Sequence, residues 1–117
     1  MLVHYCFVRR DLPLGVMAAQ LTHAAGESAA RYQDPEDGRF KHAIAVVLEA
    51  KNEDALHKVQ RKLWVHNIQY VTIEENEGPY KGQMTAIGIV PAERSKFGDI
   101  LAGYQTLKTL DNVTPAP

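Results

Sequence analysis

The sequence contains a single cysteine, Cys6, so no internal disulfide can form. Small secreted domains usually depend on disulfides, and zinc fingers and iron–sulfur sites need several cysteines, so these classes are excluded. Long apolar runs are also missing, because Ala43 to Leu48 is far shorter than the ~20 residues that cross a bilayer. The segment Met1 to Cys6 has no basic leader or small-residue cleavage site. We therefore expect a cytoplasmic protein without a membrane partner.

An excess of charge of one sign is missing as well. Thirteen Lys and Arg against fourteen Asp and Glu give a formal net charge of −1, so attraction to nucleic acid must come from a local cluster. The 117 residues, 45% hydrophobic and 23% charged, suffice for one globular core and are too few for two ordinary domains. We expect a single domain over 1–110 and a flexible, proline-bearing tail over 111–117.

The spacing of apolar residues predicts alternating strands and helices. Strands are expected over Leu2–Arg9, Ala43–Leu48, Gln69–Glu75 and Met84–Val90, and helices over Leu14–Tyr32, from the capping residue Asn52 to about Asn67, and from Pro91 to Leu101. This order predicts an α/β fold, a three-layer α/β/α domain with a mixed, mostly parallel four-stranded sheet. The run from Ala43 to Leu48 is apolar without alternation, which predicts a central strand covered on both faces.

The turn from Arg9 to Gly15 is the first candidate binding segment. It follows a strand and precedes a helix, which is where α/β sheets bind their ligands. Two arginines beside a helix N-terminus would favour an anion such as a phosphate. This interpretation makes Arg10, Asp11 and Gly15 substrate-binding candidates. The alternative is that Arg9 and Arg10 are solvated charges at a strand end and that Asp11 only closes the turn.

Polar side chains on the first helix and at the end of the third strand are the candidates for catalysis. Gln20 and His23 are three residues apart and share a helix face, which Glu27 continues. His23 could act as a general acid or base, or could only hydrogen-bond a neighbouring backbone group. Glu75 at a strand end could orient a water molecule. His4 and His42 fall in predicted strands, and His57 and His66 fall in a predicted helix that we interpret as offering no carboxylate or cysteine at ligand spacing, so we expect no metal. Cys6 is expected to be a buried small hydrophobe.

These segments resemble a known family. Val8-Arg9-Arg10-Asp11-Leu12, followed by Gly15 and by Ala18-Ala19-Gln20-Leu21-Thr22-His23-Ala24-Ala25, is similar to the first strand and helix of the type 2 peptidyl-tRNA hydrolases. The likeness continues through Ala45–Ala50 and Thr85–Pro91 and covers about residues 3 to 108. The resemblance implies a mixed sheet between helical layers and hydrolysis of the ester that joins a peptide to the 3′ end of tRNA. It also implies that no metal or organic cofactor is needed.

The chain departs from the pattern of this family at several positions. The loop before the first helix lacks the family's lysines, Glu75 falls where the family has an aspartate, and only Thr85 matches the Thr-Lys-Thr segment. Each missing cation removes one phosphate contact, so we expect weak tRNA binding. We expect catalytic roles for His23, Glu75 and Thr85. The residues expected to bind the acceptor end of peptidyl-tRNA are Arg10, Asp11, Gly15, Gln20 and Lys81.

Two other functions are compatible with the same scaffold. One is a binding module for RNA or protein that has lost catalysis, and the other is a hydrolase of small esters. A homodimer is a possible assembly, to which Trp64 and Tyr70 could contribute, although core packing is the expected fate of each ring. The hydrolase hypothesis depends on Arg10 and Glu75 lying in one crevice, where both can touch a bound molecule.

Overall fold

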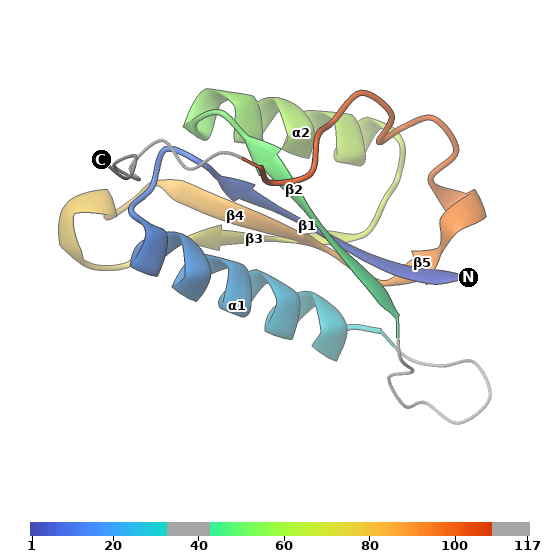
Figure 1. Cartoon of the computed structure of the whole chain (residues 1–117), viewed down its shortest axis with the longest axis horizontal. Coiled ribbons are helices and arrows are strands. Elements are labelled where there is room, and N and C mark those ends of the chain that lie inside the picture. Colours follow the sequence, from blue (N-terminus) through green and yellow to red (C-terminus); the bar gives the residue numbers. More distant parts are fainter. Residues whose placement is uncertain (33–42, 109–117) are drawn as a thin grey trace, which may run out of the picture.

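The computed structural model of the chain describes residues 1–32 and 43–108, and the tail expected over 111–117 lies outside them. The elements in chain order are β1 (Leu2–Arg9), α1 (Leu14–Ala30), β2 (Ile44–Ala50), α2 (Glu53–Val65), β3 (Tyr70–Glu74), the 3-10 helix η1 (Gly78–Tyr80), β4 (Met84–Ile89), β5 (Ala92–Glu93) and the 3-10 helix η2 (Arg94–Lys96). Figure 1 shows α1 and α2 on opposite faces of one sheet. The α/β fold is therefore confirmed, and all four predicted strands and the first two of the three predicted helices are present.

The sheet differs from the prediction in its pairing. Its strand order is β2-β1-β4-β3, and β5 pairs with β1 beside this path. Only β1 and β2 pair in parallel, while β1 with β4, β1 with β5 and β3 with β4 are antiparallel. The prediction of a mostly parallel, four-stranded sheet is wrong, because β4 inserts between β1 and β3 and separates two strands that run in the same direction.

Two local predictions also fail. β2 lies at an edge of the sheet rather than at its centre, and Ile44 at its start is 41% exposed. The helix expected from Pro91 is replaced by β5 and η2. The N-terminal strand captures this segment, because Arg94 N–H donates to the Met1 carbonyl at 3.0 Å and the Met1 ammonium pairs with Glu93.

The core consists of two layers, one on each face of the sheet. Neighbouring residues of β1 point to opposite faces, so Phe7 packs in the layer under α2 and Val8 in the layer under α1. α2 begins at Asn52, whose side chain accepts from the Ala55 N–H at 2.9 Å, and it buries Leu56, Val59 and Leu63 at helical spacing. The amphipathic pattern predicted for this helix is confirmed.

The buried stripe of α1 contains one large apolar residue, Met17, followed by the polar or small residues Gln20, Ala24 and Ser28. Small side chains let the helix backbone approach the sheet closely. The closest approach is at Gly88 of β4, where an added Cβ atom would lie 2.2 Å from the Ala24 carbonyl oxygen. This contact sets the distance between the α1 backbone and the sheet.

A buried polar cluster connects α1 to β1. Ser28 Oγ donates to the Ala24 carbonyl at 2.6 Å and lies 2.7 Å from His4 Nε2. Because the hydroxyl proton is committed to the carbonyl, His4 Nε2 is the donor in the second bond. Burial lowers the pKa of His4 from its usual 6.5 and raises the pKa of Cys6 to about 11. Cys6 is buried and its thiol is neutral at pH 7, in agreement with the expected hydrophobic role.

We expect the free energy of unfolding to fall as the pH drops below 6.5. The unfolded chain binds a proton on His4 near its usual pKa, whereas the folded chain keeps this imidazole neutral until a lower pH. Denaturant unfolding between pH 7.5 and pH 5 measures this loss. His4→Gln should flatten the decline, whereas His66→Gln, at an exposed position, should leave it unchanged. Equal slopes for wild type and His4→Gln would contradict the assignment.

Candidate functional site

The candidate site lies where β3 ends, between the N-terminal half of α1 and the start of β4. β1, β2 and β3 run in the same direction, so their carboxyl ends meet at this edge of the sheet. The α1 stripe brings Gln20 to this edge, and Gln20 is only 5% exposed. Thr85 of β4 has no exposed surface. Two buried polar side chains from distant parts of the sequence therefore meet beside Glu75.

These three side chains form a continuous chain of hydrogen bonds, Thr85–Gln20–Glu75. Thr85 Oγ1 donates to Gln20 Oε1 at 2.9 Å and also lies 3.2 Å from the Ile73 carbonyl oxygen. Gln20 Nε2 donates to Glu75 Oε2 at 2.7 Å. A hydroxyl donor on one side and a carboxylate acceptor on the other side fix the orientation of the Gln20 amide. Thr85 thus orients Gln20, and Gln20 orients the carboxylate.

The second oxygen of Glu75 is held by the backbone. Its Oε1 accepts from the Asn76 N–H at 3.0 Å and from the Glu77 N–H at 3.4 Å. Glu75 itself is tied to the loop before β4, since its N–H donates to the Gln83 carbonyl and its carbonyl accepts from the Gly82 N–H. The carboxylate is therefore positioned by donors on both oxygens while the residue stays partly exposed. Such an arrangement suits a group that must present a lone pair in one direction.

The Glu75 carboxylate opens onto a pocket of about 190 Å³. His23, on the exposed side of α1, lines this pocket together with Glu27, Glu74 and Asn76. The expectation that Gln20, His23 and Glu27 converge on one face is confirmed, since all three line the pocket. Among the described residues, the lining includes the carboxylates of Glu27, Glu74 and Glu75 and no lysine or arginine. The pocket itself is thus unfavourable for a phosphate.

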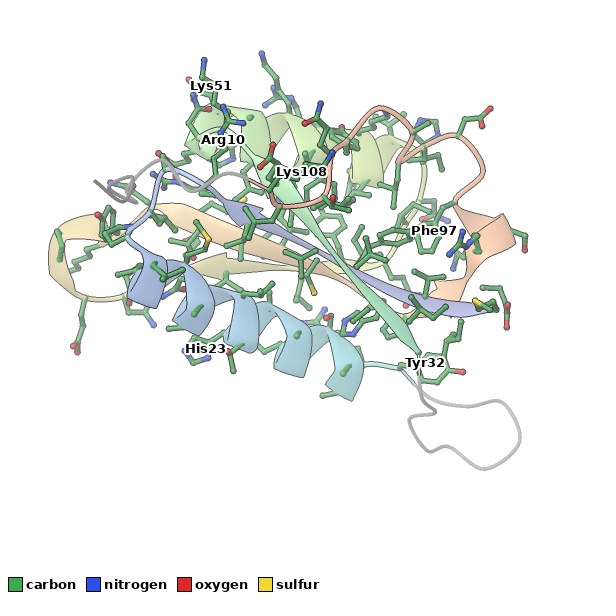
Figure 2. The ribbon with its side chains drawn as sticks, in the orientation of Figure 1. Arg10, His23, Tyr32, Lys51, Phe97 and Lys108 are labelled. Carbon is green, nitrogen blue, oxygen red and sulfur yellow. The ribbon has the colours of Figure 1, made fainter. Side chains whose placement is uncertain are left out.

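Arg10 lies on another part of the same edge. Its guanidinium pairs with Glu49 of β2 at 3.2 Å, and the backbone N–H of Arg10 donates to the Ala50 carbonyl at 2.9 Å, which places Arg10 beside Lys51. Figure 2 shows Arg10 and Lys51 on the α2 side of the sheet, with His23 beyond α1 on the other side. Arg10 is not among the residues that line the pocket onto which Glu75 opens. This pocket therefore does not bring Arg10 and Glu75 together as the sequence predicted.

The remaining substrate-binding candidates also lie outside the pocket. Gly15 is exposed in the first turn of α1, and Lys81 is exposed directly after η1. Asp11 is occupied by Arg9, whose Nε and Nη2 donate to the two carboxylate oxygens at 2.9 and 3.0 Å. None of these three residues lines the pocket.

Arg9 is a structural residue that the sequence did not reveal. It is 6% exposed, so the alternative of a solvated strand-end charge is wrong for this residue. Besides Asp11, its Nη1 donates to Gln83 Oε1 at 2.8 Å and to the Met84 carbonyl at 3.2 Å. Gln83 is 74 residues away in the sequence, so no local pattern could have indicated the contact. The arginine ties the end of β1 to the start of β4, which holds Thr85 in place.

We expect Arg9→Lys to lower the free energy of unfolding by about 2 kcal/mol. An ammonium group cannot make the paired bonds to Asp11 and also reach Gln83 and the Met84 carbonyl, so buried acceptors lose their donors. Denaturant unfolding measures the change. Arg10→Lys is the matched control, because the Arg10 side chain is 29% exposed against 7% for Arg9, and its 3.2 Å bond to Glu49 is one that an ammonium group can also make. Equal losses in both variants would contradict this role of Arg9.

Comparison with known proteins agrees with this architecture. The fold is an α/β domain with a polar site at the carboxyl ends of its strands, as is typical of ligand-binding and hydrolytic α/β proteins. A family model described as peptidyl-tRNA hydrolase PTH2 matches residues 2–107. The chain belongs to this peptidyl-tRNA hydrolase family, as its resemblance implied.

The solved structures support the fold. A protein of unknown function from Agrobacterium tumefaciens is similar, with a TM-score of 0.65 and 14% sequence identity over 90% of this chain and 96% of that chain. A search of curated proteins found no significant match. Over residues 1–32 and 43–108, no helix is long and apolar enough to span a membrane. Within the same ranges, no three His, Cys, Asp or Glu side chains are grouped as a metal site requires.

Proposed function

We propose that this protein hydrolyses the ester between peptide and tRNA in peptidyl-tRNA, which returns free tRNA to translation. Membership of the peptidyl-tRNA hydrolase family supports the reaction class. The single observation that carries the proposal is the chain Thr85–Gln20–Glu75, because it aims a fixed carboxylate into a pocket beside a histidine. In this proposal Glu75 is the general base and His23 is the general acid, so no covalent nucleophile is needed.

In the proposed reaction, Glu75 accepts a proton from a water molecule in the pocket. The water oxygen attacks the ester carbonyl carbon and forms a tetrahedral intermediate. The bond from this carbon to the ribose 3′ oxygen then breaks, and His23 donates the proton that this oxygen takes up. The products are a peptide carboxylic acid and a tRNA with a free 3′ hydroxyl. An ester is an activated substrate, so positioning and proton transfer account for catalysis.

Gln20 and Thr85 act in this mechanism as positioning residues. Thr85 is fully buried and therefore reaches the substrate only through Gln20. Gln20 holds one oxygen of Glu75, and the backbone N–H groups after β3 hold the other. We assign the remaining lone pair of the Glu75 carboxylate to the attacking water in the pocket.

The distribution of charge supports two binding surfaces, one for the ester end of the substrate and one for the phosphates of the tRNA. The pocket is lined by carboxylates and suits the end of the substrate that carries the ester, where no phosphate follows. Arg10 and Lys51 beside β2, with Gly15 and Lys81 elsewhere along the edge, are the groups that we assign to the phosphates of the acceptor end. With so few cations, binding should be weak and should decrease steeply with salt.

A single-turnover assay with N-acetylated aminoacyl-tRNA tests the proposed function. We expect release of N-acetyl amino acid well above the buffer rate. The same acyl group on a simple alcohol ester should react far more slowly, because that ester lacks the phosphate contacts. Equal rates for both substrates would indicate a hydrolase of small esters instead. Salt-dependent tRNA binding without any release would indicate an RNA-binding module.

A further inference from the structure

The turn between α2 and β3 leaves the single tryptophan of the sequence at the surface. The buried stripe of α2 ends at Leu63, so Trp64 and Val65 fall on the outer face of the helix, where they are 76% and 75% exposed. The expected core packing of Trp64 is therefore wrong. Asn67 adopts a left-handed backbone with a φ of 56°, and the chain turns into β3. Trp64 thereby lies close to Tyr70, the first residue of β3, since both line the same two hollows.

The hollows beside Trp64 form one continuous groove. The largest, of about 510 Å³, contains Arg61 and shares Trp64 and Tyr70 with a second hollow of about 390 Å³. The second shares Arg31 with a third hollow of about 280 Å³, which also contains Lys96 of η2. We call the three hollows together the α2–β3 groove.

The α2–β3 groove is separate from the candidate site. It is built at the start of β3, whereas Glu75 and its pocket lie at the end of this strand, and the two linings have no residue in common. Figure 2 shows Tyr32 and Phe97, which line the third hollow, at the opposite end of the sheet from Arg10 and Lys51. A ligand of the groove would therefore bind away from the groups that we assign to the substrate phosphates.

The groove is basic although the sequence has a net charge of −1. Arg31, Arg61 and Lys96 line it, and all three are exposed. None of the ion pairs between described residues uses any of these three cations. Within residues 1–32 and 43–108, no Asp or Glu lines the groove. It is thus the kind of local cationic cluster that a chain of balanced composition needs in order to bind a polyanion.

Aromatic rings lie among these cations. Trp64 and Tyr70 line one hollow with Arg61 and the next hollow with Arg31. Unpaired nucleobases stack on exposed rings while Arg and Lys pair with the phosphates, so this combination is typical of surfaces that bind single strands. The exposed Asn67 amide in the second hollow can bond a base edge or a ribose hydroxyl. An apolar partner would cover the rings but would leave the cations without counter-charges.

We propose that the α2–β3 groove binds a short stretch of unpaired RNA. A base stacks on Trp64 beside Tyr70, and Arg61, Arg31 and Lys96 pair with successive phosphates along the groove. This RNA binding goes beyond the proposed hydrolysis, because it takes place at the other end of β3 and needs no acyl group on the RNA.

The fluorescence of Trp64 in the full chain tests this proposal, because this single tryptophan lies in the groove. We expect unacylated oligouridylate to quench it saturably, with a Kd below about 100 μM in dilute buffer. The logarithm of the association constant should fall with the logarithm of salt concentration with a slope of about −2, which corresponds to three phosphate contacts on a single strand. Duplex RNA should not quench, because its bases are already paired and stacked.

Variants of the groove assign the contacts, with anisotropy of labelled oligouridylate as the measurement. Trp64→Ala should raise the Kd at least about tenfold, which is the effect of losing one stacked base, and Trp64→Phe should recover most of the affinity. Arg61→Gln should make the salt slope shallower by about 0.7. Lys58→Gln is the matched control, because Lys58 is exposed on α2 but lines none of the three hollows, and it should leave the affinity and the slope nearly unchanged.

Other results would overturn the proposal. RNA that raises the anisotropy without quenching Trp64 binds elsewhere, and an absence of both signals means that no RNA binds. Equal quenching by oligoglutamate would indicate a site for acidic peptides, and equal affinity for oligodeoxyuridylate would exclude RNA as the specific occupant. The probe contains no ester, so a failure of the hydrolysis assay leaves this result unaffected, and a failure here leaves the proposed hydrolysis standing.

Discussion

Glu75→Gln is expected to lower kcat/KM for peptidyl-tRNA by about a hundredfold to a thousandfold, which is the usual effect of losing a general base. The amide that replaces the carboxylate keeps a similar shape but cannot take a proton from water. Glu75 is partly exposed, so the fold should remain stable. Single-turnover release of N-acetyl amino acid from tRNA measures the effect, and it should appear in kcat because the group acts on the reacting water rather than in binding.

The matched control for this prediction is Glu77→Gln. Glu77 is exposed, lies two residues further along the chain and contributes only its backbone N–H to the Glu75 carboxylate. The Glu77→Gln substitution removes the same charge from the same loop, so a general effect of charge on tRNA binding would change KM in both variants. A rate that survives in Glu75→Gln, or that falls equally in Glu77→Gln, would remove Glu75 from the mechanism.

The elements that could be predicted from the sequence are those whose signals are local. Apolar spacing and a capping residue placed α2, and a run of β-branched and aromatic residues placed β1 with both bounds correct. The partners of the strands depend on contacts between distant segments, which no local pattern encodes. The continuous apolar run of β2 indicated a buried centre, yet the strand lies at an edge because β4 takes the place beside β1.

In the candidate site, too, the sequence predicted the features that depend on local spacing and missed those that depend on contacts between distant segments. Gln20 and His23 were predicted to share a face because helical spacing is local, and Glu75 was singled out because it ends a strand. The contact of Thr85 with Gln20 crosses 65 residues, and at the sequence level Thr85 was supported by family resemblance alone. Arg9 and Arg10 are adjacent and chemically identical, yet one is buried against Asp11 and the other pairs with Glu49. Side chains alternate along an extended chain, so the adjacent Arg9 and Arg10 point in opposite directions and meet different partners. The sequence does not show which of the two arginines is buried.

Gly88→Ala is expected to have the largest effect on stability. The new methyl carbon would lie 2.2 Å from the Ala24 carbonyl oxygen and 2.6 Å from Ser28 Oγ, so α1 must move away from the sheet. The obstruction is helix backbone, which cannot yield as a flexible side chain would. We expect a loss of about 3 kcal/mol or more in the free energy of unfolding and a fall in Tm of about 10–20 °C. Thermal and denaturant unfolding measure both quantities.

The displacement caused by Gly88→Ala should reach the candidate site as well. Gln20 lies one turn before Ala24 on α1, so lifting the helix lengthens the 2.9 Å bond from Thr85 and releases the carboxylate of Glu75. Turnover should therefore fall even at temperatures where the variant is folded. Gly26→Ala is the matched control, since its added methyl meets nothing within 4 Å and should stabilise α1 by about 0.5–1 kcal/mol. If the folded Gly88→Ala variant retained full activity, the distance between α1 and β4 would not determine the orientation of the Glu75 carboxylate. The proposed role of Gln20 as a positioning residue would then be wrong.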